Sequence, residues 1–298
     1  MRIGYPCINR TINCRANRTF RLKSYSETRL IETVQQNIDC LLEMLRFNVS
    51  NDIMFFRITS DLIPFASHSI NRFDWQTFFS NQFKQIGHFI NESSVRISMH
   101  PDQFIIINSP DKDVYKRSLA ELVYHAQVLD VMGLDTTAKI QVHIGGVYRD
   151  KVASMKRFAC RFKGLPESVR RRLVIENDDR LYTLYDCISL NKVTGIPVLL
   201  DTFHHRVNCS GETEVEALKA VKATWRDQDG LPMIDYSSQK PKARKGNHAE
   251  TIDLNNFRVF LENSRPFDFD VMLEIKDKEI SALKAVQLAK FDERFLDK

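Results

Sequence analysis

Short apolar segments that end in a histidine or a carboxylate recur along this chain of 298 residues. The clearest is PVLLDTFHH (197–205), in which three apolar residues stop at Asp201 and His204 follows three residues later. An uninterrupted apolar run of this length is typical of a strand that is buried on both faces. A carboxylate at the end of such a strand, with an imidazole close behind it, can hold a metal ion.

Eight short strand-like segments, several of which end in this way, alternate with helix-forming segments along the chain. This alternation implies right-handed crossovers and a parallel sheet. Eight units in a chain of this length fit a (β/α)8 barrel, a TIM barrel of the α/β class. An open, doubly wound sheet is the alternative, but no glycine-rich phosphate loop follows the first strand. The predicted strands are 2–5, 53–58, 95–99, 140–142, 173–175, 198–200, 233–236 and 270–273.

The segments between the strands carry apolar residues at helical spacing. Ser24-x-x-Glu27 is a possible capping box and predicts where the first helix begins. No linker, internal repeat or low-complexity segment interrupts the pattern, so we expect one domain over residues 1–298. The further predicted helices are 75–90, 118–132, 151–163, 181–190, 215–225, 257–261 and 280–288.

The composition is that of an ordinary globular protein, with 43% hydrophobic and 27% charged residues. A net charge of +5 permits a polyanionic partner, but the charge alone favours simple solubility as its explanation. None of the six cysteines forms a C-x-x-C pair, which predicts reduced cysteines and no disulfide framework. The sequence has no evident secretory signal and no apolar run near the roughly 20 residues that span a bilayer. We therefore expect a cytoplasmic protein with no membrane partner.

The ligand-type residues should meet at one face of the barrel. In a parallel barrel the carboxyl ends of all strands converge, and active sites form there. Imidazole and carboxylate donors together suit Zn²⁺, Mn²⁺ or Fe, and these donors are more than one ion needs. Glu176 could bridge two ions, and paired ions can activate a water and stabilise both the attacking and leaving oxygens of a phosphodiester. The strand ends contribute His100, His143, Glu176, Asp201 and Glu274, and the loops beyond them add His68, His204, Asp235 and His248.

Each of these residues has a simpler explanation when it is considered alone. A single histidine at a strand end is often a hydrogen-bonded core residue, and Glu176 could be the buried partner of an arginine. Five of the eight strand ends carry such residues, however, and packing alone does not require charge at one layer of a barrel. His88 and His125 lie within predicted helices and are expected at the surface, while His205 has no assigned role.

Two basic clusters lie on opposite sides of the predicted barrel. The cluster 170–172 precedes the fifth strand and is expected to be solvated surface away from the site. The second cluster, with Lys242, Arg244 and Lys245, follows the seventh strand on the site side. Basic loops beside a metal site suit the phosphate backbone of a nucleic acid.

Gln103 and Phe104 follow His100 on the same rim. An aromatic ring and an amide that project there could insert into a base stack. Alternatively, Phe104 packs beneath its own loop, and its position in the sequence does not decide between the two arrangements.

Short motifs along nearly the whole chain match a known family in their combined order. They are GYPCIN (4–9), LIPFASH (62–68), SMHPDQF (98–104), VHIGG (142–146), IENDD (175–179), DTFHH (201–205), IDYSSQ (234–239), GNHA (246–249) and Glu274. In these motifs the chain resembles the UV damage endonucleases. That family is similar in fold and metal layout to endonuclease IV and, more distantly, to xylose isomerases.

The resemblance implies a (β/α)8 barrel with two or three divalent ions, with Mn²⁺ first in expectation and Zn²⁺, Co²⁺ or Mg²⁺ as alternatives. It implies cleavage of UV-damaged double-stranded DNA immediately 5′ to a cyclobutane pyrimidine dimer or 6-4 photoproduct, which leaves a 3′-hydroxyl. Gln103 and Phe104 match the pair that probes the duplex, where the family commonly has Tyr at the second position. Tyr5 and Asn9 match residues near the scissile phosphate, which implies a catalytic role beside Glu176. The matching ligand positions are His68, His100, His143, Glu176, Asp201, His204, His248 and Glu274.

The chain departs from the family pattern at two positions. Asp235 stands where some members have His, and it can still ligate a metal. Met233 stands where some members have a Lys that contributes to the metal site, and a thioether is a poor ligand for hard ions.

The sequence thus favours a monomeric, metal-dependent DNA repair endonuclease. One alternative is a sugar isomerase or epimerase on the same barrel. Such an enzyme needs neither a basic rim nor an aromatic side chain that inserts into a base stack. Another is a protein that binds damaged DNA without cutting it, although recognition alone needs no set of metal ligands.

Overall fold

Eight parallel strands close into a barrel in the computed structural model, which describes residues 1–296. Each strand pairs with the next, and β8 pairs with β1, so the (β/α)8 barrel is confirmed and the open sheet is excluded. The last two residues of the predicted domain lie outside the described part. The strands are β1 (Ile3–Pro6), β2 (Phe55–Ile58), β3 (Arg96–Met99), β4 (Lys139–His143), β5 (Leu173–Glu176), β6 (Val198–Asp201), β7 (Met233–Tyr236) and β8 (Asp270–Leu273).

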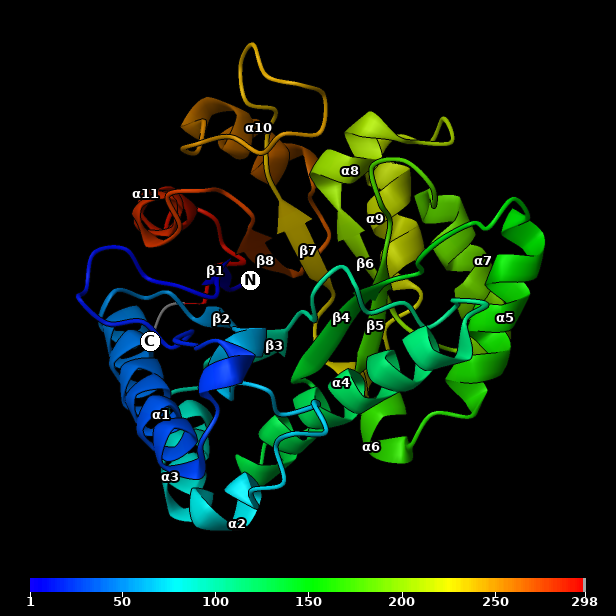
Figure 1. The fold of residues 1–298 in the computed structure, drawn as a ribbon. Helices are drawn as coiled ribbons and strands as arrows, with labels where there is room; N and C mark the ends of the chain where they lie inside the picture. The colour runs from blue at the N-terminus through cyan, green and yellow to red at the C-terminus, as the bar shows by residue number, and fades with distance from the viewer. Residues whose placement is uncertain (297–298) are drawn as a thin grey trace.

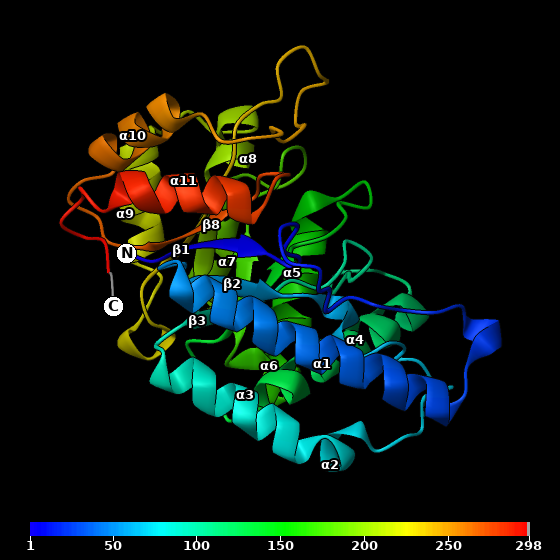
Figure 2. The ribbon, with the colours of Figure 1, turned by 90° about the vertical axis from the view of Figure 1, so that its left-hand side faces the viewer.

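The helices surround the barrel (Figure 1). Figure 2 shows that the loops after β1 and β7 project on the side to which the arrowhead of β1 points. This is the face that receives the carboxyl ends of all eight strands. The helical elements are η1 (Leu22–Ser24), α1 (Glu27–Ser50), η2 (Ser60–Leu62), α2 (Trp75–Phe78), α3 (Ser80–Glu92), α4 (Lys112–Val131), α5 (Lys151–Lys163), α6 (Glu167–Arg170), α7 (Leu184–Thr194), α8 (Thr202–Val207), α9 (Glu214–Lys222), η3 (Asp227–Asp229), α10 (Leu254–Asn263) and α11 (Glu279–Ala289).

Strand side chains alternate between the helix layer and the barrel interior. In β5, Leu173 and Ile175 belong to the main core, whereas Val174 belongs to a separate inner cluster. Glu176 follows Val174 at the same parity and therefore faces inward above that cluster. The inner cluster is an apolar layer made by Phe55, Val174, Leu199, Met233 and Met272.

Most helix boundaries differ from the predicted ones, and α4 begins at Lys112, six residues before the predicted start. The N-cap of α1 is Ser26, whose side chain accepts a hydrogen bond from the backbone of Arg29, so the predicted Ser24 box is wrong. The predicted helix 75–90 is two helices, because the chain breaks helical geometry at the fully buried Phe79. Among the described residues, no helix is both long enough and apolar enough to cross a membrane.

The cysteine prediction is wrong for one pair. Cys14 and Cys40 form a disulfide, with their Cα atoms 5.2 Å apart. Cys14 lies in the loop after β1, and Cys40 lies on the buried side of α1, against which this loop folds. Sequence spacing gives no sign of this pairing because 26 residues separate the two cysteines.

Two polar residues that were expected at the surface are buried. His125 faces inward from α4, where Ser60 and the backbone carbonyl of Glu121 lie within hydrogen-bond distance of its ring nitrogens. Arg172 donates hydrogen bonds to Asp130 and to the backbone carbonyl of Leu134. His125 finds its partners in η2 and α4, and Arg172 finds its partners in α4 and the loop after it, which is why the core accepts both side chains.

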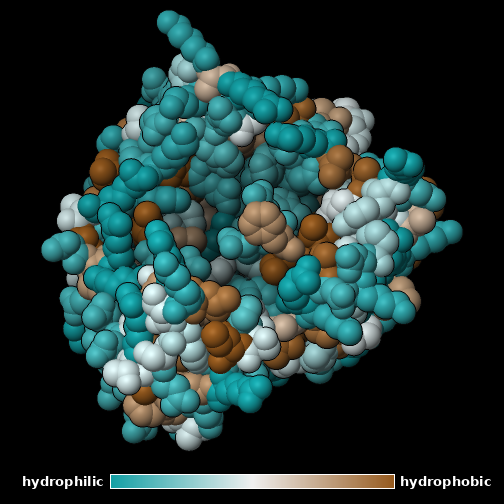
Figure 3. Space-filling view, viewed as in Figure 1, coloured by the Kyte–Doolittle hydropathy of each residue, from teal (hydrophilic) through white to brown (hydrophobic). Residues whose placement is uncertain are grey.

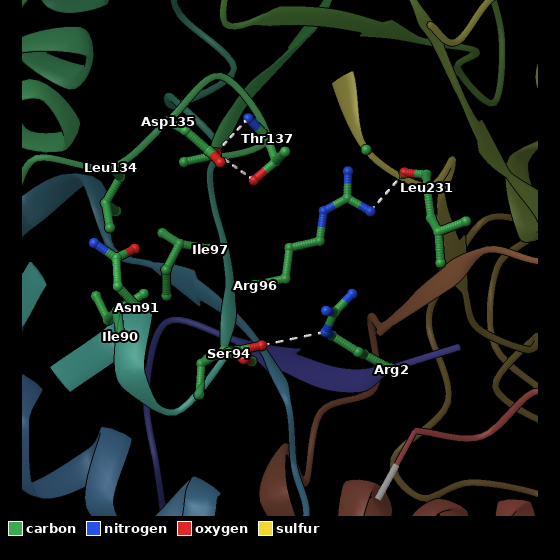
Figure 4. Close-up of a pocket in the computed structure, with 13 residues that line it drawn as sticks. Arg2, Ile90, Asn91, Ser94, Arg96, Ile97, Leu134, Asp135, Thr137 and Leu231 are labelled. Carbon is green, nitrogen blue, oxygen red and sulfur yellow. Dashed lines mark hydrogen bonds between the residues drawn. The ribbon is translucent and has the colours of Figure 1, made fainter. Parts of the chain in front are cut away.

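The amino-terminal end of the barrel interior holds a set of matched charges. Arg96 donates to Asp270 at 2.7 Å and to the backbone carbonyl of Leu231, and the Lys139 ammonium lies 2.5 Å from Asp229. Arg96 belongs to a cleft of about 330 Å³ on this side of the molecule, where Arg2 donates to a backbone carbonyl (Figure 4). Buried cations and carboxylates are therefore equal in number at this end.

Candidate metal centre

A carboxylate and two imidazoles meet at the carboxyl ends of β3, β4 and β5. His143 pairs with Glu176 in the strand register, and its Nε2 lies 2.8 Å from Glu176 Oε1. His100, directly after β3, places its own Nε2 at 3.1 Å from the same oxygen. Glu176 is 2% exposed, and all three residues can reach a common metal ion.

Asp201 and His204 are brought together by the start of helix α8. Asp201 ends β6 and is the N-cap of α8, where its Oδ1 accepts a hydrogen bond from the backbone nitrogen of His204 at 2.7 Å. This cap directs the imidazole of His204 back toward the carboxylate, with Nδ1 at 3.2 Å from Oδ2. The short helix after PVLLD therefore explains the three-residue spacing of the motif.

Asp235 lies beside Asp201 in the β6–β7 pair, and a second candidate group forms there. Glu176, Asp201 and Asp235 are all buried and can reach a common ion. Gln141 connects two members of this group, because its amide nitrogen donates to Asp235 at 2.6 Å and also to Glu176.

The donors at this end fit divalent metal ions. The Nε2 atoms of His100 and His143 face one oxygen of Glu176, and the Oδ2 atom of Asp201 is buried and forms no hydrogen bond. A buried polar atom without a partner is costly, and nitrogen and carboxylate oxygen donors are those that Zn²⁺ and Mn²⁺ accept. The residues that could hold such ions are His100, His143, Glu176, Asp201, His204 and Asp235.

The electrostatics of the cluster reflect its excess of carboxylates. Burial raises the pKa of Asp201 to about 6. Burial opposes ionisation of Glu176 as well, but the nearby His143 and His100 outweigh it and hold the pKa of Glu176 below its usual range. In turn Glu176 outweighs the effect of burial on His143 and raises the pKa of that imidazole to about 9. Such mutual stabilisation shows that the carboxylates need positive charge near them.

The remaining predicted ligands lie at different distances from this cluster. His248 lies in the loop after β7, with its ring 5.9 Å from that of His204 and its Nδ1 at 2.7 Å from the backbone carbonyl of Glu274. The Glu274 side chain turns toward Arg57. His68 is exposed in the loop before α2, where its Nδ1 accepts from the backbone of Ile70, and it belongs to neither candidate ligand group.

A cleft of about 710 Å³ opens above the cluster, and His100, His143, His248 and Glu274 line it. Gln103 and Phe104 form part of its rim, and Phe104 is 73% exposed, which excludes the arrangement in which it packs beneath its loop. Figure 3 shows this face of the molecule, which is mainly hydrophilic around a central hollow.

The basic residues after β7 project beside the cleft. Lys242, Arg244 and Lys245 are exposed in a loop that is closed by a bridge between Gln239 and His248. Lys245 donates to the backbone carbonyl of Val207, which ties the loop to the end of α8. The same loop therefore carries a predicted ligand, His248, and the predicted phosphate-binding side chains.

Tyr5 and Asn9 are buried away from the ligand cluster. The Tyr5 hydroxyl donates to Asn48 on α1 at 2.7 Å and accepts from the amide of Asn9 at 3.0 Å. Asn9 also accepts from the backbone of Thr11, so its side chain organises the loop after β1. A direct role for either residue at a scissile phosphate stays a prediction.

Sequence reasoning missed Arg57 and Gln141, which both face the interior of the barrel. Arg57 is the one charged residue in the apolar segment IMFFRI, and Gln141 is the one polar residue in the predicted strand 140–142 (IQV). Alternation from their neighbours Phe55 and His143 places both side chains inward. A polar residue in an otherwise apolar strand was the signal that could have found them.

Comparison with known proteins gives consistent matches over the full chain. The family model described as UV-endonuclease UvdE matches residues 1–295. The protein named UV DNA damage endonuclease from Clostridium perfringens (strain 13 / Type A) is 40% identical over 294 residues, which cover 97% of this chain and 71% of that protein.

Solved structures agree with these matches. The crystal structure of SacUVDE superposes with a TM-score of 0.93 at 44% identity and covers 97% of this chain and 98% of that one. Endonuclease IV from Thermus thermophilus superposes with a TM-score of 0.58 at 15% identity, over 97% of this chain and 98% of that one. This second likeness concerns the fold alone.

Proposed function

This chain belongs to the UV-endonuclease UvdE family, and from that premise we propose that it is a metal-dependent hydrolase that nicks UV-damaged double-stranded DNA. The observation that carries the proposal is the position of an exposed aromatic ring, Phe104, on the rim of a cleft whose floor is lined by His100 and His143. A sugar-binding pocket has no need of a ring that projects into solvent.

The incision would fall immediately 5′ to cyclobutane pyrimidine dimers and 6-4 photoproducts and leave a 3′-hydroxyl. Divalent ions, two or three per chain and Mn²⁺ first in expectation, would supply Lewis acidity toward the phosphate and lower the pKa of a bound water. Glu176, His100 and His143 would hold such ions at the floor, and Asp201 with His204 would complete the site. Zn²⁺, Co²⁺ and Mg²⁺ remain alternatives.

Recognition would rest on the rim of the cleft. Phe104 and Gln103 would enter the space that the damaged bases leave when they rotate out of the stack, a step that costs less at a lesion with weakened stacking. Lys242, Arg244 and Lys245 would contact the phosphate backbone. Tyr5 and Asn9 would act near the scissile phosphate through the loop that they order. We also propose a single domain, a monomer and a cytoplasmic location.

The decisive experiment is incubation of UV-irradiated supercoiled plasmid with the protein and Mn²⁺. We expect nicking that requires the metal and the irradiation, followed by 5′ incision next to the lesion on an end-labelled duplex with one defined dimer. Binding to irradiated DNA without nicking would indicate a damage sensor. If the protein neither binds nor nicks irradiated DNA, the result favours the sugar isomerase or epimerase.

A further inference from the structure

Arg57 reaches across the barrel interior from β2 to the carboxylates of β7 and β8. Its Nη2 donates to both oxygens of Asp235 at 2.9 Å and to the side-chain oxygen of Gln141 at 2.7 Å. Its Nη1 donates to Glu274 at 2.5 Å. The side chains of Arg57 and Asp235 are almost fully buried, so this ion pair is shielded from water, whereas Glu274 is 21% exposed.

The two neighbouring aspartates of the site differ in how their oxygens are used. Both oxygens of Asp235 accept from Arg57, and its Oδ2 also accepts from Gln141. Asp201, its register partner on β6, keeps Oδ2 buried without a hydrogen bond, with only the Nδ1 of His204, another candidate ligand, 3.2 Å away. Asp201 thus presents an open oxygen to the site, whereas the oxygens of Asp235 are already engaged by the protein.

Charge balance leads to the same distinction. Four carboxylates, Glu176, Asp201, Asp235 and Glu274, converge at this end of the barrel, and their mutual repulsion requires compensating cations. An arginine keeps its charge at every working pH, and its planar fork fits two carboxylates at once.

We propose that the Arg57 guanidinium is a fixed cation of the metal centre. It stands between Asp235 and Glu274 in place of a divalent ion and removes Asp235 from the set of metal ligands. The chain then holds two divalent ions through His100, His143, Glu176, Asp201 and His204, and no third ion at Asp235. This inference rests on the proposed metal-dependent function and sharpens the composition of its site.

The closing experiment counts Mn²⁺ ions per chain by equilibrium dialysis against MnCl₂. It compares the wild type with two matched variants at neighbouring register positions, Asp235→Asn and Asp201→Asn. We expect Asp235→Asn to keep the two ions of the wild type and Asp201→Asn to bind one ion fewer. Any other pattern in a wild type that binds Mn²⁺, above all the loss of an ion in Asp235→Asn, overturns the inference.

A second pair of variants tests Arg57 itself. Arg57→Met leaves Asp235 and Glu274 without a cation and should bind one additional Mn²⁺ per chain, whereas Arg57→Lys keeps the charge and should bind the wild-type number. An unchanged ion count in a folded Arg57→Met protein contradicts the inference. If Arg57→Met does not fold, the aspartate pair decides.

The same measurements separate this inference from the function on which it rests. A wild type that neither binds Mn²⁺ nor nicks irradiated plasmid overturns both. A wild type that binds the metal and nicks the plasmid, but loses an ion in Asp235→Asn, overturns only the role of Arg57.

Discussion

The two ends of the barrel interior both bury charged side chains, but only one end balances them. At the amino-terminal end, the buried Arg96 and Lys139 face Asp270 and Asp229, and the less buried Arg2 and Arg226 add a second cation to each carboxylate. Each of these charges has an ion-pair partner within the protein.

At the carboxyl-terminal end the carboxylates outnumber the fixed cations. Among the described residues, Arg57 is the one buried arginine that pairs with this set of Glu176, Asp201, Asp235 and Glu274, and it reaches only Asp235 and Glu274. Two imidazole nitrogens and one carboxylate oxygen there are buried without a hydrogen bond. The comparison teaches that buried charge alone does not identify a functional site. An excess of buried carboxylates over fixed cations, together with buried atoms that could bind a metal and lack a hydrogen bond, does identify one.

The largest expected effect is the loss of nicking in Glu176→Gln. The amide keeps the shape of the side chain but removes the charge that His100 and His143 face, so metal binding should fail. Since removal of a group one shell further from a metal already costs about 10–100-fold, we expect more than about 100-fold loss in nicking of irradiated plasmid. Full activity in this variant would refute the role of the unbalanced end, and circular dichroism controls for folding.

Asp270→Asn, at the amino-terminal end of the barrel, should lower stability and leave nicking unchanged. It leaves the buried guanidinium of Arg96 without its carboxylate, and breaking a buried ion pair typically costs about 3–5 kcal/mol of unfolding free energy. Urea denaturation measures this loss, and nicking per folded molecule should stay at the wild-type rate. The exposed pair of Glu167 with Arg170 offers a control, since Glu167→Gln should leave the denaturation midpoint unchanged.

Phe104→Ala tests whether the rim of the unbalanced end reads the lesion. Stacking of a base on an aromatic ring is worth about 1–3 kcal/mol, so the preference for irradiated over intact DNA should fall about 5- to 150-fold. Competition binding with both DNAs measures the ratio. Phe291 is a matched control, because it is 92% exposed and follows α11, which runs back toward the strand starts. Equal ratios in Phe104→Ala and the wild type would contradict the insertion of Phe104 at the lesion.

The smallest expected effect is on the pH dependence of stability, and it comes from His125, which lies behind the carboxyl-terminal end of the barrel. Ser60 lies between its ring and the backbone carbonyl of His100, and burial lowers the pKa of His125 to about 4. Between pH 6.5 and 4 the unfolded chain therefore binds the proton that the folded protein excludes, and stability falls as pH falls. We expect a loss of about 1–2 kcal/mol between about pH 7 and pH 5.

The difference in unfolding free energy between the wild type and His125→Gln isolates this contribution from the other titrating groups. His88→Gln, a change at an exposed histidine, should keep the wild-type pH dependence. A parallel pH profile for His125→Gln and the wild type would contradict the buried, neutral state of His125.

The strands and the layer of ligand-type residues could be predicted because their signals are local. Strands β7 and β8 have the predicted bounds, and β5 and β6 extend by the one residue, Glu176 or Asp201, that was assigned to their ends. A run of apolar residues that must be buried, and a charged residue where it stops, are visible within a short stretch of sequence. The barrel then brings those ends to one face through its topology.

Several side chains could not be placed in this way because their environment is made by distant segments. His125 and Arg172 look like surface residues in their own helix or loop, yet both are buried by parts of the chain that lie tens of residues away. Tyr5 faces α1 and not the cleft, since strand alternation puts its neighbour Gly4 on the opposite face. The disulfide of Cys14 with Cys40 depends in the same way on how a loop folds onto a helix.

By itself the sequence determined the class of fold, the face of the barrel that carries the site and the chemical types that meet there. Only the tertiary structure decided which carboxylates remain open and which are already paired, because this depends on Arg57 crossing the closed barrel from β2 to β7 and β8. Strand periodicity sets the direction of each side chain, but the closure of the barrel sets its partners. A buried charge takes its role from those partners.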